Sequence, residues 1–265
     1  MVDAVSPTPV AVVAGAGAAG DGIGNGRATA ILLAREGTRV VCVDRKHELG
    51  VATAAMIEAE GGSALAVGAD VTDPHDCERV AAAAVEAFGG IDHLVNNVGV
   101  GSRGSILDTD PTTWERVMRI NVSSAYHLSR AVLPSMIERG RGAIVNISSI
   151  AAIRPRGLTA YSASKGAVMA LTQAMAVDHG PDGIRVNCVL PGPVLTPMVG
   201  GEEMDPQLRE RRKRASVLGI EGHRLGHRPR RGVPPVGPGP LHHRPEHRGR
   251  RRGIPRRAIA LTRDA

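Results

Sequence analysis

The sequence predicts an α/β fold in which helices cover both faces of a doubly wound parallel sheet, all within a single domain. Three observations carry this prediction. Short apolar segments alternate with longer helical segments along the chain. The apolar segments are continuous rather than alternating, as in strands buried on both faces. The chain has 265 residues, of which 42% are hydrophobic, so it is long enough to bury a large core.

The predicted elements follow one another without a linker before residue 200. Residues 8–14 form an apolar run that is too short for a helix, so we expect a buried strand that ends in glycines. The expected order is then helix 27–36, strand 39–43, helix 47–60, strand 64–68, helix 75–88, strand 91–96, helix 112–139, strand 143–147, helix 159–179 and strand 184–190. Crossovers between parallel strands are right-handed, which gives the doubly wound arrangement.

The formal charge is divided unevenly along the chain. The net charge is +7, but residues 223–265 contribute +10 and residues 1–222 carry −3. The body therefore has no electrostatic reason to bind nucleic acid, and 2% aromatic residues offer few stacking platforms for bases. A basic arm for nucleic acid or a membrane surface remains an alternative for the tail, although its high Pro and Gly content argues against it.

Other function classes are excluded by what the sequence lacks. No apolar run is long enough to span a membrane, and the N-terminus has no basic-then-apolar signal pattern. Cys42, Cys77 and Cys188 lie far apart, so we expect neither a disulfide framework nor a metal site. These features predict a cytoplasmic protein without a membrane partner.

A glycine-rich turn and a carboxylate point to a dinucleotide. Glycines recur through residues 15–26, between the first strand and the first helix, where backbone can approach a pyrophosphate. Asp44 ends the second strand about 20 residues further on, where a carboxylate accepts ribose hydroxyls and repels a 2′-phosphate. Taken separately, the turn could be a flexible loop and Asp44 a solvated residue.

Two further pairs point to acid–base chemistry. Tyr161 and Lys165 are four residues apart, hence on one helix face, and an ammonium beside a phenol favours the phenolate. Tyr161 could then act as acid or base near neutral pH. Ser148 and Ser149 follow the strand 143–147, at the edge of a parallel sheet where ligands bind. Taken alone, Tyr161 and Lys165 could be an ordinary pair on a helix surface, and the two serines could cap a helix or a loop.

Together these motifs make residues 8–222 resemble a short-chain dehydrogenase/reductase of the single-domain, Rossmann-type form. The subgroup that it most resembles contains 3-oxoacyl-carrier-protein reductases and NAD-dependent alcohol dehydrogenases. The matching pieces also include Asp70-Val71, Asn96-Asn97-Val98-Gly99, Asn121 and Pro191-Gly192-x-Val194-x-Thr196. The resemblance implies an enzyme that interconverts a secondary alcohol and a ketone with NAD(H).

The resemblance also implies roles for individual residues. Tyr161 would be the proton donor or acceptor, Lys165 would hold the nicotinamide ribose, and Ser149 would bind the substrate carbonyl. Asn121 would hold a water in a proton relay. Asn97 and Gly99 would line the adenosine ribose side of the sheet. The full set of implied NAD-binding residues is Gly15, Gly22, Ile23, Gly24, Asp44, Asp70, Val71, Asn97, Gly99, Tyr161, Lys165, Pro191, Val194 and Thr196.

The chain departs from the family pattern at three points. Ala14 replaces the usual threonine, and the glycine turn is longer than usual, so which glycines touch the pyrophosphate stays open. In the family, the catalytic serine usually lies 13 residues before the tyrosine. Ser148 has this spacing from Tyr161, whereas Ser149 lies 12 residues before it. We prefer Ser149 because the second serine of such a pair normally carries the role.

Beyond these three points, the chain departs from the family pattern most at its C-terminus. Residues 223–257 are mostly Arg, Pro, Gly and His, which cannot bury enough apolar surface to fold. Back-translated and read one base later, this stretch can give the family's usual last strand, so we expect a frameshift near codons 222–223. We therefore divide the chain into an NAD-binding domain, residues 1–222, and a tail, residues 223–265. The resemblance implies a homotetramer if the ending were in frame, whereas the printed chain could instead bind NAD without turnover.

Overall fold

The computed structural model describes residues 8–18, 22–155, 157–192, 205–207 and 210. These residues fall within one compact unit, residues 1–227. The strands are β1 (Val10–Ala14), β2 (Arg39–Asp44), β3 (Ala64–Gly68), β4 (His93–Asn96), β5 (Gly142–Ile147) and β6 (Ile184–Val189). The helices are α1 (Asn25–Arg35), α2 (His47–Ala59), α3 (Pro74–Phe88), α4 (Pro111–Met118), α5 (Ser124–Glu138) and α6 (Thr159–His179).

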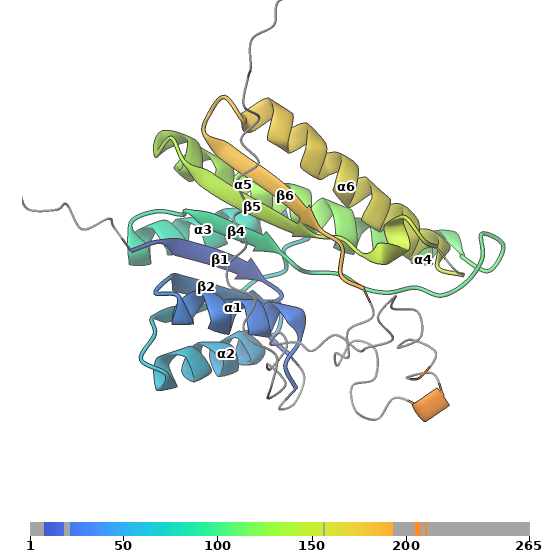
Figure 1. Cartoon of the computed structure of the whole chain (residues 1–265), viewed down its shortest axis with the longest axis horizontal. Coiled ribbons are helices and arrows are strands. Elements are labelled where there is room, and N and C mark those ends of the chain that lie inside the picture. Colours follow the sequence, from blue (N-terminus) through green and yellow to red (C-terminus); the bar gives the residue numbers. More distant parts are fainter. Residues whose placement is uncertain (1–7, 19–21, 156, 193–204, 208–209, 211–265) are drawn as a thin grey trace, which may run out of the picture. The chain divides into compact units, whose positions relative to one another are not determined.

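The six strands form one parallel sheet in the order β3-β2-β1-β4-β5-β6 (Figure 1). The direction of strand order reverses between β1 and β4, which is the topological switch point of a doubly wound sheet. The predicted fold class is therefore confirmed. A crevice is expected at the carboxyl ends of β1 and β4.

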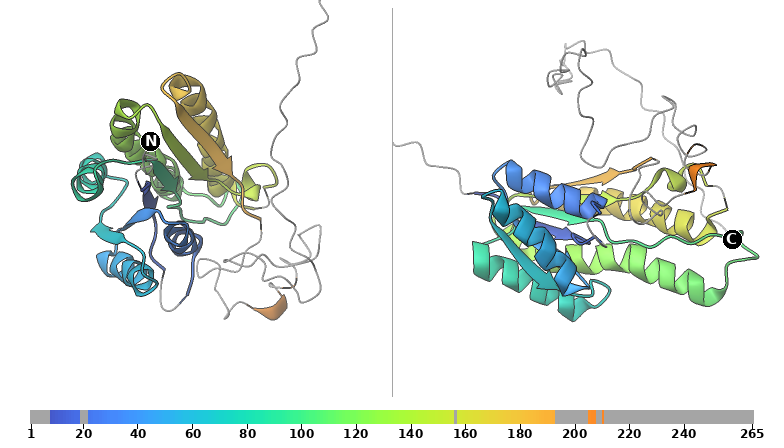
Figure 2. Two further views of the ribbon diagram at one scale, coloured as in Figure 1. Left: turned by 60° about the vertical axis from the view of Figure 1, so that its left-hand side comes forward. Right: turned by 90° about the horizontal axis from the view of Figure 1, so that it is seen from below.

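Helices cover both faces of the sheet, as the end-on view makes clear (Figure 2). One hydrophobic cluster joins the sheet to α3, α5 and α6, and includes Leu94, Leu128 and Met175. A second cluster joins the opposite face to α1 and α2 through Ile31 and Ile57. The central strand β1 is buried along its whole length, which explains why its sequence is an uninterrupted apolar run.

The long helix expected over residues 112–139 is divided in the structure. It consists of α4, a π-helical turn at Arg119–Ser123, and α5. Asn121 lies in that turn and is 1% exposed. Such turns insert one extra residue into a helix and often occur at functional sites.

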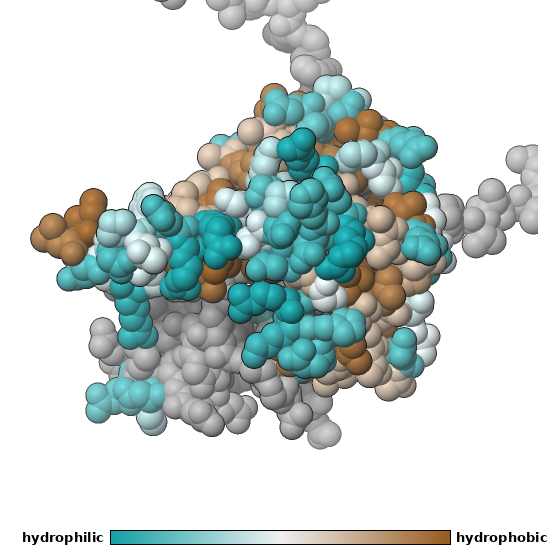
Figure 3. Space-filling view, turned by 180° about the vertical axis from the view of Figure 1, so that it is seen from behind, coloured by the Kyte–Doolittle hydropathy of each residue, from teal (hydrophilic) through white to brown (hydrophobic). Residues whose placement is uncertain are grey.

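The described surface seen from the back is mostly hydrophilic, with hydrophobic residues scattered over it (Figure 3). Ile106 and Leu107 are the most exposed large apolar side chains together with Val177. None of the helices in the described ranges is long and apolar enough to cross a membrane.

Candidate functional site

A cleft of about 650 Å³ lies at the carboxyl ends of the central strands. Its walls come from the turns that follow β1, β2, β3 and β4, which is where the switch point predicts a ligand. Seven of the predicted cofactor residues line this cleft: Gly15, Gly24, Asp44, Asp70, Val71, Asn97 and Gly99. The structure thus brings together residues that lie up to 84 positions apart in the chain.

The glycine turn lets backbone pack against backbone. Gly15 has φ +68°, and the Asn97 side-chain amide donates to its carbonyl at 3.2 Å. A Cβ on Gly26 would collide with the Gly15 carbonyl oxygen, so only glycine allows α1 to start this close to β1. Gly24 precedes α1 and has no side chain to cap it, which leaves the first N–H groups of the helix for another acceptor.

Gly22 and Ile23 are described but are not among the residues that line the cleft. Gly20 lies outside the described residues. Of the glycines in the turn, the structure places Gly15, Gly17, Gly24 and Gly26 at the cleft.

Asp44 faces the glycine turn from the end of β2. Its Oδ2 accepts from the Gly17 N–H at 3.0 Å, and its Oδ1 accepts from the Lys46 N–H at 3.0 Å. A Cβ on Gly17 would lie 2.6 Å from Asp44 Oδ2, so this contact requires glycine. The carboxylate is therefore held in place at the cleft before any ligand binds.

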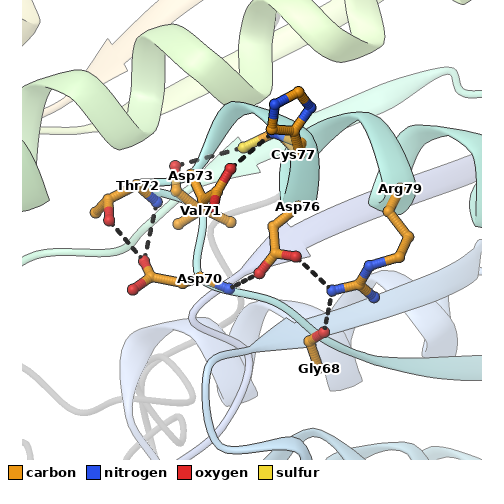
Figure 4. A network of polar contacts seen from close by, with 9 residues as sticks. Gly68, Asp70, Val71, Thr72, Asp73, Asp76, Cys77 and Arg79 are labelled. Atoms are coloured by element: carbon orange, nitrogen blue, oxygen red, sulfur yellow. Dashed lines mark hydrogen bonds and ion pairs between the residues drawn. The ribbon is translucent and has the colours of Figure 1, made fainter.

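A network of polar contacts shapes the cleft after β3 (Figure 4). Asp70 Oδ1 accepts from the N–H and the hydroxyl of Thr72, at 3.0 and 2.8 Å. The Asp70 N–H donates to Asp76 Oδ2 at 2.7 Å, and Arg79 donates to Asp76 Oδ1 and to the Gly68 carbonyl. The hydrogen bond from Arg79, with that from the Asp70 N–H, lowers the pKa of Asp76. Asp76 is thereby an acceptor that orients the Asp70 turn.

Tyr161 and Lys165 both lie on α6, and the Lys165 ammonium is 5.9 Å from the centroid of the Tyr161 ring. Lys165 is 4% exposed and donates to the Ile147 carbonyl at 2.8 Å. Burial lowers the pKa of Lys165 to about 8, because the charged form loses solvation. Gly99 lies beside Lys165 and Asn121, since a Cβ at this position would be 3.2 Å from Lys165 Nζ. Gly99 also lines the cleft, so the Tyr161–Lys165 pair lies next to the cleft.

The two candidate serines differ in their surroundings. Ser148 is 3% exposed, and its hydroxyl donates to the Lys165 carbonyl at 2.8 Å. Ser149 is only partly buried, and its hydroxyl oxygen accepts from the Ala151 N–H at 3.2 Å, which leaves its proton available. Ser148 therefore holds α6 against β5, whereas the Ser149 hydroxyl donates to no group among the described residues.

The Asn121 side chain makes three hydrogen bonds to protein groups. Its Oδ1 accepts from the Val100 N–H at 2.7 Å, while its Nδ2 donates to the Val100 carbonyl and to the Ser164 hydroxyl. Ser164 in turn donates to the Tyr161 carbonyl at 2.7 Å. The π-helical turn thus connects the loop after β4 to the helix that carries Tyr161.

The remaining predicted residues follow β6. Pro191 is partly buried, and its carbonyl accepts from the Ile150 N–H at 3.0 Å. Val194 and Thr196 lie outside the described residues. Among the residues that the structure describes, no group of three His, Cys, Asp or Glu could hold a metal ion.

Sequence reasoning missed three residues that support the site. The Ser102 hydroxyl accepts from the Tyr161 N–H at 3.2 Å, and Asp76 orients Asp70 as described above. Arg27 is buried beneath the glycine turn. The contacts of Ser102 and Arg27 span many residues and leave no periodic signal, whereas the Asp76 contact is local and resembles an ordinary turn.

Comparison with known proteins agrees with this geometry. Residues 9–207 match the family model of the short chain dehydrogenases. A 2-(S)-hydroxypropyl-CoM dehydrogenase from Xanthobacter autotrophicus is 38% identical over 202 residues, which cover 74% of this chain and 79% of the relative. An L-rhamnose 1-dehydrogenase (NAD(P)(+)) from Azotobacter vinelandii is 39% identical over 203 residues, with the same coverage of 74% and 79%.

A solved structure extends the similarity to the fold. A crystal structure of a protein from Burkholderia xenovorans, described as a short-chain dehydrogenase/reductase, has a TM-score of 0.77 and 37% identity. The match covers 83% of this chain and 85% of the other. The names of the two relatives give different substrates, so they identify a reaction class rather than a substrate.

Proposed function

The chain belongs to the short-chain dehydrogenase/reductase family, and we propose that it interconverts a secondary alcohol and a ketone with NAD(H). The 2-(S)-hydroxypropyl-CoM dehydrogenase and the L-rhamnose 1-dehydrogenase are named as oxidoreductases of small molecules, so these two relatives do not support a binding protein without turnover. The observation that carries the proposal is the Tyr161–Lys165 pair, joined to the glycine-lined cleft through Gly99.

The described residues fit a dinucleotide. Gly15, Gly24 and the start of α1 offer backbone N–H groups for a pyrophosphate, and Asp44 would accept the adenosine ribose hydroxyls. Asp70 and Val71 would border the adenine, while Pro191, Val194 and Thr196 would hold the nicotinamide end. We propose NAD(H) over NADP(H), because a 2′-phosphate would meet the Asp44 carboxylate.

The protein groups would supply positioning and proton transfer, while NAD would supply hydride exchange. Tyr161 gives or takes the proton at the substrate oxygen. The Lys165 ammonium lies beside the Tyr161 ring and would bind the nicotinamide ribose, and Ser149 would donate a hydrogen bond to the substrate oxygen as charge develops. Asn121 would connect Lys165 to solvent through a bound water.

The experiment is a spectrophotometric assay of NADH formation by the full chain with a panel of secondary alcohols. One relative, 42% identical over 193 residues, is named as inactive, so NADH binding is measured separately from turnover. Binding without turnover on any alcohol or ketone would contradict the proposal.

The two serines are separated by alanine variants. We expect Ser149→Ala to reduce turnover by about 10²-fold, since a donor to the developing charge is removed. Ser148→Ala is expected to retain most of the turnover and to lower the melting temperature instead, because its hydroxyl is bonded to the Lys165 carbonyl. The reverse pattern would transfer the role to Ser148.

The assembly and extent of the domain are also proposals. We propose that residues 1–222 form the NAD-binding domain of a cytoplasmic protein, that residues 223–265 are separate from it, and that an in-frame ending would give a homotetramer. The tail lies outside the described residues. Sequencing the gene across codons 222–223 tests the frameshift: a clean read in the present frame, with codons that cannot encode the family ending, would contradict it.

A further inference from the structure

Arg27 lies beneath the glycine turn and is 1% exposed. It is the third residue of α1, which begins at Asn25 within the glycine-rich segment. Burying a guanidinium is costly unless its N–H groups are satisfied, so its partners indicate what it stabilises.

The guanidinium donates to both sides of the lengthened part of the turn. Nη2 donates to the Ala18 carbonyl at 3.0 Å, and Nη1 donates to the Gly22 carbonyl at 2.8 Å. Nε donates to the Thr53 hydroxyl at 3.0 Å, and Thr53, which is 0% exposed, donates to the Ala16 carbonyl at 2.9 Å. Arg27 and Thr53 together therefore bind three carbonyls of one turn.

The direction of those carbonyls determines whether the turn can accept an anion. A carbonyl oxygen that faced a pyrophosphate would repel it, whereas backbone N–H groups attract it. Bonds to Arg27 keep the Ala18 and Gly22 carbonyls on the protein side, while Gly17 and Ala18 themselves line the cleft. The planar guanidinium fixes both carbonyls in one geometry, which a lysine cannot do.

We propose that Arg27 is a positioning residue that preorganises the glycine turn for a pyrophosphate. This inference rests on the proposed NAD-dependent function. If Arg27 served only to hold α1 against α2 through Thr53, its loss would lower stability without a selective effect on pyrophosphate binding.

The test compares Arg27→Met with Arg35→Met in the full chain. Arg35 is on the same helix, but its guanidinium is exposed and bonded to Glu60 at 2.7 Å. Calorimetry measures Kd for ADP, which has the pyrophosphate, and for adenosine, which lacks it. We expect Arg27→Met to raise Kd for ADP by at least about tenfold and Kd for adenosine by less than about twofold.

The same loss should be visible in kinetics. Arg27→Met should raise KM for NAD while kcat at saturating NAD stays within about twofold, since the turn can still be ordered by the bound ligand. Arg27→Lys should recover only part of the ADP affinity. Arg35→Met should behave as the wild type in every measurement.

An unchanged Kd for ADP in folded Arg27→Met, or equal weakening of ADP and adenosine, would overturn the inference. If Arg27→Met does not melt cooperatively, Thr53→Val replaces it, because this change removes the hydroxyl that joins Arg27 to the Ala16 carbonyl. We then expect Kd for ADP to rise about threefold with adenosine unchanged, and no rise would overturn the inference. A wild-type chain that binds neither ADP nor NADH would contradict the proposed function itself.

Discussion

Asp44 is the residue on which the expected cofactor preference depends. Both its oxygens accept backbone N–H groups, from Gly17 and Lys46, so the carboxylate is anchored where a 2′-phosphate would lie. We expect kcat/KM for NAD to exceed that for NADP by at least about tenfold, since a close like-charge contact costs more than about 1.4 kcal/mol. Asp44→Asn should bring the two values closer together. Comparable efficiency of the wild type with both cofactors would contradict this role.

Lys165 should make stability depend on pH. The pKa of Lys165 is about 8 in the folded chain and 10.5 for an ordinary solvated lysine, so between these pH values the unfolded chain binds a proton that the folded chain has released. Stability from this group therefore rises with pH from 8 to 10.5, by about 3 kcal/mol, and is constant outside that window.

Denaturant unfolding at several pH values measures this effect. The difference in unfolding free energy between the wild type and Lys165→Met should increase across the window, because methionine does not titrate. Lys46→Met is the control, since Lys46 is exposed and its replacement should leave the profile unchanged. A flat difference from pH 8 to 10.5 would show that burial does not affect Lys165 in this way.

At the scale of elements, the site depends on how one loop meets one helix. The loop after β4 contacts the start of α6: the Gly104 N–H donates to the Gly157 carbonyl, the Thr159 N–H donates to the Gly104 carbonyl, and the Ser102 hydroxyl accepts from the Tyr161 N–H. An acceptor in the first turn of a helix satisfies an N–H that has no partner within the helix. Ser102 thereby helps to set the position of Tyr161.

Ser102→Ala should lower turnover more than it lowers cofactor binding. We expect kcat to fall about 3- to 10-fold, since Tyr161 loses part of its positioning, with about 1 kcal/mol lost in stability. The NADH Kd should stay within about twofold. Ser105→Ala is a matched control on the same loop, because the Ser105 hydroxyl bonds to Asp108 instead. Equal kcat values for the two variants would contradict a role of Ser102 in positioning Tyr161.

Element order and type could be predicted because the buried strands are short continuous apolar runs that alternate with longer helical segments. The interruption of the helix over 112–139 could not, because Asn121 and the π-helical turn depend on contacts with Val100 and Ser164. Similarly, Tyr161, Lys165 and Asp44 form recognisable motifs. In sequence, Arg27 is typical of any surface helix, and its burial depends on contacts with residues such as Ala18, Gly22 and Thr53 that the sequence does not reveal.

At the scale of the whole molecule, only one face of strand β6 packs into a hydrophobic cluster of the described residues. Ile184 and Val186 on β6 are buried toward α6, while Arg185 and Val189 alternate with them and are exposed. Within the described residues, β6 is one of the two edge strands of the sheet, and β3 is the other. The described parts of the candidate site, the cleft and the Tyr161–Lys165 pair, come from elements up to β6, while the predicted residues Val194 and Thr196 lie outside the described residues.

Deletion of residues 223–265 tests the proposed domain boundary. We expect the shortened chain to bind NADH with a Kd within about twofold of the full chain, because the described residues that line the cleft all precede the tail. Any salt-dependent retention on DNA should be lost with the tail, because the segment carries +10. Loss of NADH binding on deletion would show that the boundary is misplaced.

The most direct test of the central claim compares the chain's only two tyrosines, Tyr161 and Tyr126. With the best alcohol from the panel, Tyr161→Phe should lower turnover by about 10²-fold or more while the NADH Kd stays within about twofold, since the ring remains and only the proton is lost. Tyr126 is 45% exposed on α5, and Tyr126→Phe should match the wild type. Wild-type turnover by Tyr161→Phe would contradict the assignment of Tyr161 as the acid–base residue.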